Sequence, residues 1–446
     1  MAQRPRQLHF NVHVSTGGNH EGAWRHPRSE PVRLTALDYQ RKIAGIAERG
    51  KLDALFFGDT PVLSDNVRLR PVEQLDPVAL HGALSAVTQN IGLAATISTS
   101  FNEPFNVARK IASLDLLSGG RVGWNIVTTS SENAARNYGV DNITAHSERY
   151  RRAEDFVQVV KKLWDSWDEG AIVNDRASGI YADTDHIHKI FHEGEFFKVR
   201  GPLNVPPSPQ GRPVLIQAGS SETGVAFAAR HAEVVFTAQR TLEEGQRFYS
   251  ELKRQVVQNG RDADHVKLVV GISPILGGTE EEAKRLAAEL DELTVPEYGL
   301  RQVLNFSGVD LSTYPLDGPV PLDAFPDTNA VESHRSRTAL VVALAKSEKL
   351  TIRQLLHRLA GARGHQTFVG STEQLAARLE EWFLSGAADG FNFMPAYLPG
   401  GLEDFVDGVI PILQRKGLFR RDYEGTTLRD HYDLPRPVNQ YATQAA

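Results

Sequence analysis

Residues 114–129, LDLLSGGRVGWNIVTT, contain the pattern that decides the fold. They include the last turns of a predicted helix. This helix begins at Pro104, since the first helical turn tolerates proline, and ends at Gly119-Gly120. The expected buried stripe of this helix consists of Val107, Ile111, Leu114 and Leu117. Val122–Val127 follows at once as a short strand of mostly apolar residues. A helix that leads through two glycines into such a strand predicts one α/β unit of a buried parallel sheet.

The same alternation of strand and helix recurs along the chain. Strands are predicted at Leu8–Val14, Ala54–Phe57, Ile91–Thr96, Val122–Val127, Val214–Gln217, Val234–Phe236, Lys267–Ser273 and Gly390–Phe393. Further helices are predicted at Thr35–Arg49, Pro77–Val87, Ser147–Trp167, Glu222–Arg230, Glu243–Gln258, Glu280–Leu290 and Phe405–Leu413, with one more behind a capping box of Ser371 and Gln374. Roughly eight successive β-then-α units favour an α/β protein with a closed (β/α)8 TIM barrel over an open sheet.

Two long stretches interrupt this rhythm. Residues 171–213 are rich in His, Asp and Pro, and Glu193-Gly194 is expected to form a turn between two short strands. Residues 294–370 mix proline-rich loops with two helical patterns. Because long loops in a barrel are usually functional, we expect both insertions to cover the mouth of a single barrel domain that spans residues 1–446.

The composition of the chain argues against several classes of function. The 446 residues are 41% hydrophobic and 23% charged, with a net charge of −6 and no cysteine. An acidic chain without a basic stripe is not expected to bind nucleic acid. No apolar stretch is long enough to cross a bilayer, and Met1–Gln7 is expected to be a polar start rather than a signal peptide. The lack of cysteine excludes disulfides, thiolate metal sites and a cysteine nucleophile, and favours a cytoplasmic protein.

Polar residues follow the predicted strands at their carboxyl ends, where barrels of this kind place their sites. Asp59 comes just after the second strand, Thr96 ends the third, and Asn125 lies near the end of the fourth. His146 and Tyr150 open the next helix, and their spacing of four places them on one face. This set lacks the carboxylate density of a hydrolase. Asp59 as a cap of the following loop, and the His146–Tyr150 pair as a surface pair, remain alternatives.

The junction Ala218-Gly219-Ser220-Ser221 is the best candidate for a phosphate site. Gly219 allows a tight turn after a strand, and the two serine hydroxyls stand at the start of a helix. The N–H groups and the positive dipole end found there suit a phosphate dianion. A serine pair is also an ordinary helix N-cap, so the motif alone leaves that alternative open.

Histidines cluster at His186, His188 and His192, within the first insertion. Their spacing is irregular and lacks a paired motif of the H-E-x-x-H kind, so we expect no metal site there. No G-x-G-x-x-G motif follows a predicted strand, and we therefore expect no site for NAD(P)H.

Residues 121–129, RVGWNIVTT, closely resemble the fourth-strand signature of the nitrilotriacetate and dibenzothiophene-sulfone monooxygenase group of the luciferase-like superfamily. The resemblance runs nearly end to end. Other matching segments are GAWRH (22–26), AATIS (94–98), LDLLSGGR (114–121), ARNYG (135–139), HSERY (146–150), VRGPL (199–203), SPQGRP (208–213), QAGSS (217–221), AADGF (387–391) and LRD (428–430). A match of this length is specific for the family, and it implies a TIM barrel of the bacterial-luciferase type with insertions.

The resemblance also implies an activity. Enzymes of this family are the oxygenase components of two-component monooxygenases, which take FMNH2 from a separate NAD(P)H:flavin reductase and react it with O2. Thr96 and Asn125 would then be the catalytic residues, beside the N5/C4a edge of the flavin. The residues implied to bind the cofactor are Asp59, Thr96, Asn125, His146, Tyr150, Ser220 and Ser221. Because barrels of this superfamily commonly pair, a homodimer or homotetramer is expected.

The expected substrate is a small organic compound, of the organosulfur or xenobiotic type, in which a C–S, C–N or other C–heteroatom bond is oxidised or cleaved. The residues expected to line its pocket are His13, Trp24, His26, Phe57, His334 and His365. Three alternatives stay open: a flavin enzyme of the same fold that cleaves a heterocycle or a flavin, a flavin-binding protein without catalysis, and a metal-dependent barrel hydrolase.

Overall fold

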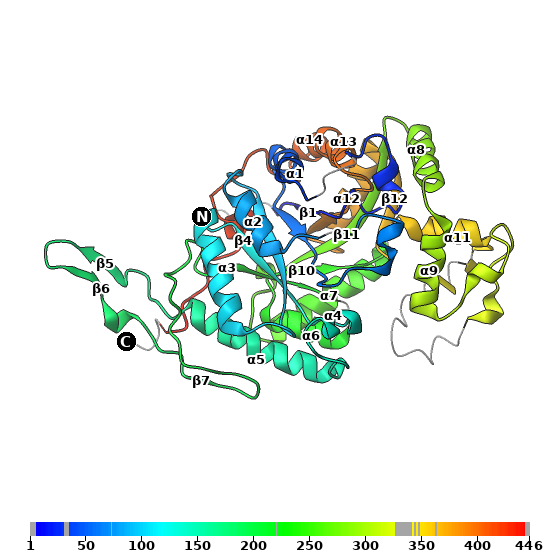
Figure 1. The fold of residues 1–446 in the computed structure, drawn as a ribbon. Helices are drawn as coiled ribbons and strands as arrows, with labels where there is room; N and C mark the ends of the chain where they lie inside the picture. Colours follow the sequence, from blue (N-terminus) through cyan, green and yellow to red (C-terminus); the bar gives the residue numbers. More distant parts are fainter. Residues whose placement is uncertain are drawn as a thin grey trace.

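An eight-stranded parallel barrel forms the centre of the molecule in the computed structural model (Figure 1). The structure describes residues 6–30, 35–72, 74–219, 221–325, 341–342, 345–346, 348–361 and 364–441. The barrel strands are β1 (His9–His13), β2 (Ala54–Phe57), β3 (Gly92–Ser98), β4 (Val122–Val127), β9 (Val214–Ala218), β10 (Val234–Thr237), β11 (Lys267–Gly277) and β13 (Gly390–Phe393). Their order is β10-β9-β4-β3-β2-β1-β13-β11, and pairing of β10 with β11 closes the ring. The predicted fold class is confirmed.

Helices cover the outside of the barrel, and most lie where the sequence predicts them. They are α1 (Leu37–Arg49), α2 (Pro77–Ser85), α3 (Pro104–Ser118), α5 (His146–Trp164), α6 (Glu222–His231), α7 (Leu242–Gln258) and α12 (Thr372–Leu384). Gly119 ends α3 in the left-handed conformation, with φ of 72°, which explains the glycine pair. Ser371 and Gln374 form the predicted capping box at the start of α12.

The predicted helix at Phe405–Leu413 consists of a π-helical turn at Phe405–Val409 and α14 (Ile410–Arg415). The helical segment begins earlier than predicted, with α13 (Gly400–Asp404). Pro411 has no N–H with which to continue the α-helical ladder, and the wider turn lies directly before it.

The interior of the barrel is closed at its amino end by the short helix α15 (Leu428–His431). Leu428 packs against the interior side chains of β2, β3 and β9 and approaches the backbone so closely that two strands carry glycine there. A Cβ on Gly92 would lie 2.4 Å from Leu428, and one on Gly123 would lie 3.2 Å from it. Gly123 of the segment RVGWNIVTT therefore leaves the space that Leu428 of the segment LRD occupies.

Residues 171–213 lie at the amino end of the barrel, because this segment joins the end of α5 to the start of β9. It contains two antiparallel hairpins, β5 (Ile172–Asp175) with β6 (Ile180–Ala182), and β7 (His192–Glu193) with β8 (Lys198–Val199). The predicted turn at Glu193-Gly194 is thus present. In Figure 1 both hairpins extend away from the end that carries α9 and α11. The expectation that this insertion covers the mouth is wrong, since a helix-to-strand connection returns the chain to the opposite end.

The second insertion lies at the carboxyl end, between β11 and α12. β11 continues beyond the barrel to Gly277 and pairs there with an additional parallel strand, β12 (Gln366–Ser371). Between them lie α8 (Glu280–Glu292), α9 (Pro296–Ser307) and α11 (Ile352–Ala360), with a small apolar core shared by α9 and α11. The strand β12 was not predicted from the sequence, and α8 belongs to this insertion rather than to the ring of barrel helices. Among the described helices, none combines the length and apolar character that crossing a bilayer requires.

Candidate active site

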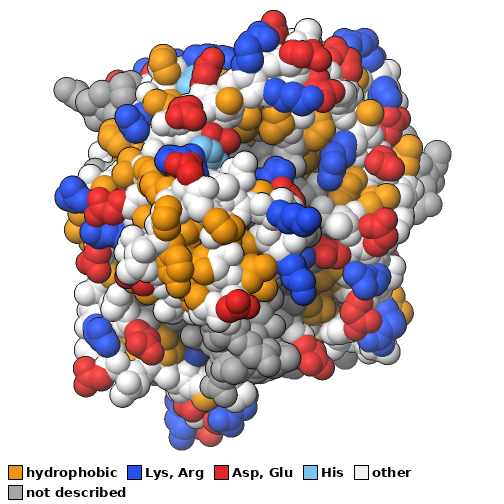
Figure 2. Space-filling view, turned by 90° about the vertical axis from the view of Figure 1, so that its right-hand side faces the viewer, with side chains coloured by type: hydrophobic (Ala, Val, Ile, Leu, Met, Phe, Trp, Pro, Cys, Tyr) orange, Lys and Arg blue, Asp and Glu red, His pale blue; other side chains and the backbone are white. Residues whose placement is uncertain are grey.

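A cavity of about 390 Å³ opens at the carboxyl end of the barrel, between the ends of β2, β4 and β9 and the starts of α5 and α6. It brings together Asp59, His146 and Tyr150, which the sequence places far apart, together with Ala218 of the predicted phosphate motif. The remaining lining residues are Thr60, Pro61, Ile126–Ser131, Arg149, Gln217 and Phe227. Figure 2 faces this end of the molecule, where acidic and basic side chains are mixed and no single sign dominates.

The start of α5 supplies three of the polar side chains. The rings of His146 and Tyr150 lie 4.9 Å apart, so the predicted shared face is confirmed. Arg149 is not among the predicted residues, but it lies on the same face and also lines the cavity. Its Nε atom is buried and has no hydrogen-bond partner among the described residues. Burial lowers the pKa of the Arg149 guanidinium, but arginine remains ionised at neutral pH, so a fixed cation lies at this wall.

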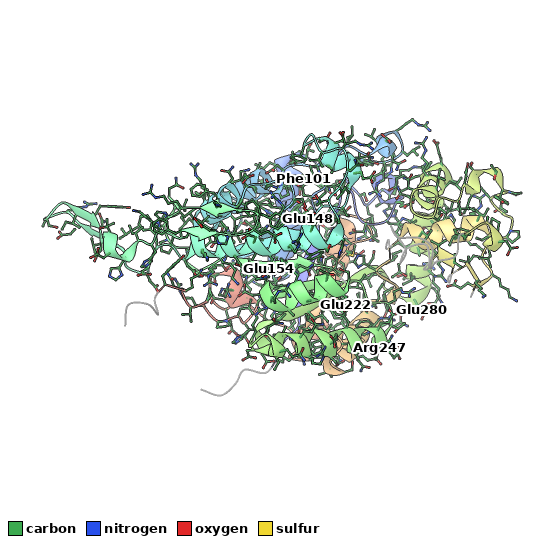
Figure 3. The ribbon with its side chains drawn as sticks, turned by 90° about the horizontal axis from the view of Figure 1, so that it is seen from below. Phe101, Glu148, Glu154, Glu222, Arg247 and Glu280 are labelled. Atoms are coloured by element: carbon green, nitrogen blue, oxygen red, sulfur yellow. The ribbon has the colours of Figure 1, made fainter. Side chains whose placement is uncertain are left out.

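The start of α6 lies beside Tyr150, and the same helix contributes Phe227 to the cavity lining. The Ser221 hydroxyl accepts a hydrogen bond from the Gly224 N–H at 3.1 Å, so Ser221 is the N-cap of the helix. A Cβ on Gly224 would lie 3.1 Å from the Tyr150 hydroxyl, which shows how closely α5 and α6 approach. Figure 3 shows the two helices side by side, with Glu148 near the start of one and Glu222 at the start of the other. Ser220 lies outside the described residues.

Thr96 and Asn125 form a hydrogen-bonded pair at neighbouring positions of β3 and β4. The Thr96 hydroxyl donates to the Phe57 carbonyl at 2.6 Å, and because that carbonyl can only accept, the Thr96 oxygen must accept from Asn125. It does so from Asn125 Nδ2 at 2.9 Å. The orientation of the amide is therefore fixed, and Asn125 Oδ1 remains buried without a hydrogen-bond partner in the described part of the chain. A buried acceptor of this kind is suited to an N–H donor from a ligand.

Asp59 is half-buried at the edge of the cavity. Burial raises the pKa of its carboxyl group, and the negative charge of Asp76 acts in the same direction. Gln217 is not among the predicted residues, but its amide side chain lines the same cavity and has a buried oxygen without a partner among the described residues. Both groups are typical of a wall that a polar ligand covers.

An aromatic series crosses the mouth above the barrel interior. His13 of β1 lies 6.0 Å from Phe56, Phe56 lies 5.6 Å from Phe236, and Phe236 stacks on His365 at 5.2 Å. His13 and His365 are among the residues predicted for the substrate pocket. Phe57 is not part of the series, because its ring packs outward against His81 at 5.1 Å. Strand alternation places the neighbouring Phe56 inside instead.

The remaining candidate residues have the following surroundings. Trp24 belongs to a short 3-10 turn at Ala23–Arg25, and His26 packs against Tyr397 at 4.8 Å. His334 lies outside the described residues. His186 and His188 both contact the carboxylate of Asp168, at 3.0 and 2.9 Å, and His192 contacts a separate aspartate.

Comparison with known proteins identifies the family of this barrel. A family described as "Luciferase-like monooxygenase" matches residues 12–389. The chain belongs to the luciferase-like monooxygenases. The predicted family and the predicted class of enzyme are thereby confirmed.

Relatives match the chain over almost its whole length. It is 48% identical to N-acetyl-S-(2-succino)cysteine monooxygenase of Bacillus subtilis (strain 168), covering 99% of this chain and 100% of the relative. It is 43% identical to nitrilotriacetate monooxygenase component A of Aminobacter aminovorans, covering 98% of both. The solved structure of DmoA from Hyphomicrobium sulfonivorans superimposes with a TM-score of 0.86 at 30% identity, over 98% of this chain and 96% of that one.

Proposed function

We propose that this protein is the oxygenase component of a two-component monooxygenase. It takes FMNH2 and O2 and oxidises or cleaves a C–S, C–N or other C–heteroatom bond in a small organic compound. The single observation that carries the proposal is the cavity that joins Arg149 and Tyr150 to Ala218 at the end of β9 and to Ile126, the residue after Asn125 on β4. The named activities of the relatives support the same reaction class.

The residues present fit an FMN cofactor. A phosphate dianion needs donors and positive charge, and the start of α6, the Tyr150 hydroxyl and the Arg149 guanidinium supply both. The ring of a dihydroflavin carries N–H groups, which suit the buried Oδ1 atom of Asn125. A positively charged phosphate wall and a buried acceptor are thus available together, as a phosphorylated flavin requires.

We assign three roles to the residues of this chain: they bind the cofactor and the substrate, orient them, and exclude water. Thr96 fixes the amide of Asn125, so that one defined oxygen is presented. His146, Tyr150 and Asp59 surround the polar part of the cofactor, and the aromatic series of His13, Phe56, Phe236 and His365 offers an apolar face to the substrate. Bound FMNH2 supplies the two electrons with which one atom of O2 enters the substrate and the other leaves as water.

We further propose that a separate NAD(P)H:flavin reductase supplies FMNH2 to this chain. The designation "component A" of the nitrilotriacetate relative supports a second component. A homodimer or homotetramer and a location in the cytoplasm, where NAD(P)H is available, complete the proposal.

The proposal is tested by mixing the protein with NADH, FMN, a flavin reductase and candidate substrates under ¹⁸O2. N-acetyl-S-(2-succino)cysteine and nitrilotriacetate are the first candidates, because the relatives are named for them. We expect one ¹⁸O atom in the oxidised product, and consumption of substrate only when all components are present. A protein that binds FMNH2 but yields no product from a broad panel would be a flavin carrier, whereas turnover that persists without flavin would indicate a hydrolase.

Arg149→Gln is expected to weaken FMN binding about 10- to 30-fold, because a charge-assisted contact to the phosphate is lost. Riboflavin lacks the phosphate, so its affinity should change little. Flavin fluorescence titrations with both ligands measure the difference. Arg151→Gln serves as the control, since Arg151 lies on the same helix but pairs with Glu195 on the surface. Equal losses for FMN and riboflavin would show that Arg149 does not contact the phosphate.

A further inference from the structure

Arg70 is a buried cation whose charge is not balanced by the described residues around it. It lies in the loop between β2 and α2, at the carboxyl end of the barrel, and only 7% of its surface is exposed. Its two hydrogen bonds are long: Nε donates to the Pro71 carbonyl at 3.5 Å, and Nη1 donates to the Tyr298 hydroxyl at 3.4 Å. A guanidinium has five N–H donors, so within the described chain most of its capacity is not used.

Other buried arginines of this protein show how such a group is normally satisfied. Arg121 is 3% exposed and has no carboxylate partner among the described residues, but its guanidinium makes five hydrogen bonds of 2.7–3.1 Å to Thr88 and to backbone carbonyls. Arg429, also 3% exposed, pairs with both oxygens of Glu233. Arg70 has neither arrangement among the described residues. Because burial of an incompletely paired charge is costly, a compensating anion is expected there.

The surroundings of Arg70 hold it against the second insertion. Its guanidinium carbon lies 5.4 Å from the centre of the Tyr298 ring, on α9 of the second insertion. Two residues earlier, Arg68 binds the carboxylate of Glu297 on the same helix, at 2.6 and 2.7 Å. The loop that begins at Asp59 of the cavity is therefore fastened to α9, and Arg70 lies at the junction. Since Figure 2 shows mixed charges over this face, long-range attraction does not select anions, and single residues must do so.

We propose that Arg70 binds a carboxylate of the substrate. This inference rests on the proposed function and adds a substrate class to it: small organic acids, in which the bond to be cleaved lies near a carboxylate. The fork of the guanidinium matches a carboxylate with two parallel hydrogen bonds, and the Tyr298 ring limits its movement. The substrates named for the two relatives, N-acetyl-S-(2-succino)cysteine and nitrilotriacetate, both carry carboxylates.

The test measures ligand binding without turnover. Protein saturated with oxidised FMN is titrated by calorimetry with N-acetyl-S-(2-succino)cysteine, with nitrilotriacetate and with the methyl esters of both. We expect Arg70→Gln to weaken binding of an acid by about 30-fold and to leave binding of its ester within twofold. Arg70→Lys, which keeps the charge but not the fork, should lie between the two. Arg301→Gln, on the exposed side of α9, should bind like the wild type.

The outcomes separate this inference from the proposed function. Equal affinity of wild type and Arg70→Gln for the acids, or equal losses for acids and esters, would overturn the role of Arg70. Wild-type protein that binds only the neutral esters would overturn the substrate class. In each of these cases FMNH2 binding and oxygen incorporation would remain as proposed. Melting temperatures of the variants show whether a loss of affinity is due to misfolding. If Arg70→Gln is misfolded, the affinities of Arg70→Lys for the acids and the esters test the role of Arg70.

Discussion

Asn125→Ala is expected to lower kcat/KM of the oxygenation about 100- to 1,000-fold, which is the loss typical when one preorganised polar contact to a reacting group is removed. The Asn125 amide is 3% exposed, its Nδ2 is held by Thr96, and its Oδ1 is buried without a partner in the described chain. Alanine removes the Oδ1 acceptor, which Thr96 orients and which no described residue of the protein occupies. Steady-state rates with excess reductase, together with the melting temperature, measure the effect.

Two valine variants serve as controls for this prediction. Thr96→Val keeps the shape but removes the hydroxyl that orients Asn125, so we expect a smaller loss, about tenfold. Thr99→Val removes a buried hydroxyl whose one hydrogen bond in the described chain goes to the Val127 carbonyl at 3.2 Å, and activity should hardly change. An Asn125→Ala enzyme with at least one third of wild-type activity would exclude the proposed role of the amide.

The barrel could be predicted from the sequence because each of its units is marked locally. Apolar runs such as Ala54–Phe57 and Val122–Val127 coincide with β2 and β4 at both ends. Glycine and serine mark the ends of α3 and the start of α12 through backbone chemistry that neighbouring residues do not alter. The strands β5, β6 and β12 of the insertions were not predicted, since short strands of this kind have little periodicity.

The positions of the insertions needed a topological argument rather than composition. In a barrel, a strand-to-helix connection lies at the carboxyl end and a helix-to-strand connection at the amino end. Residues 171–213 follow α5 and precede β9, so they belong to the amino end, as the structure shows. Their length alone predicts a segment that covers the mouth of the barrel, and that prediction is wrong.

The candidate site was predicted only in part, for two physical reasons. Helical spacing placed His146 and Tyr150 together, and the same spacing rule includes Arg149, which was overlooked. The choice between Phe56 and Phe57 depends on which face of β2 is inside, and four consecutive apolar residues do not reveal that. Arg70 has no sequence signal at all, because its burial depends on contacts with α9, more than two hundred residues away.

Several motifs that carry the family resemblance serve the fold rather than the chemistry. Asp115, of the segment LDLLSGGR, is completely buried at the amino end of the barrel. Its carboxylate accepts hydrogen bonds from the Val122 N–H at 2.9 Å, from Gln210 Nε2 at 2.8 Å and from the Ser208 hydroxyl. Gln210 in turn accepts from the backbone N–H of Arg429. One carboxylate thus joins three of the matching segments, which explains why the resemblance gives the fold and reaction class more readily than the substrate.

Asp115→Ala is expected to lower the free energy of unfolding by about 3 kcal/mol at pH 7, because buried donors lose their acceptor. Burial raises the pKa of Asp115 to about 6, against the lowering effect of the Ser208, Val122 and Gln210 hydrogen bonds. A raised folded-state pKa contributes stability that is complete below the unfolded value of 3.8 and is lost as the pH rises through about 6. The deficit of the alanine variant should therefore be larger at pH 5 than at pH 7.

Urea unfolding at the two pH values measures this deficit. Asp115→Asn keeps one acceptor oxygen and does not titrate, so it should lose less stability and show a weaker pH dependence than the wild type. Asp141→Ala, at an exposed carboxylate, is the control and should unfold like the wild type at both pH values. A deficit that is the same at pH 5 and pH 7 would mean that Asp115 is ionised at both, held as an anion by its three donors, and that hydrogen bonding rather than burial decides its charge.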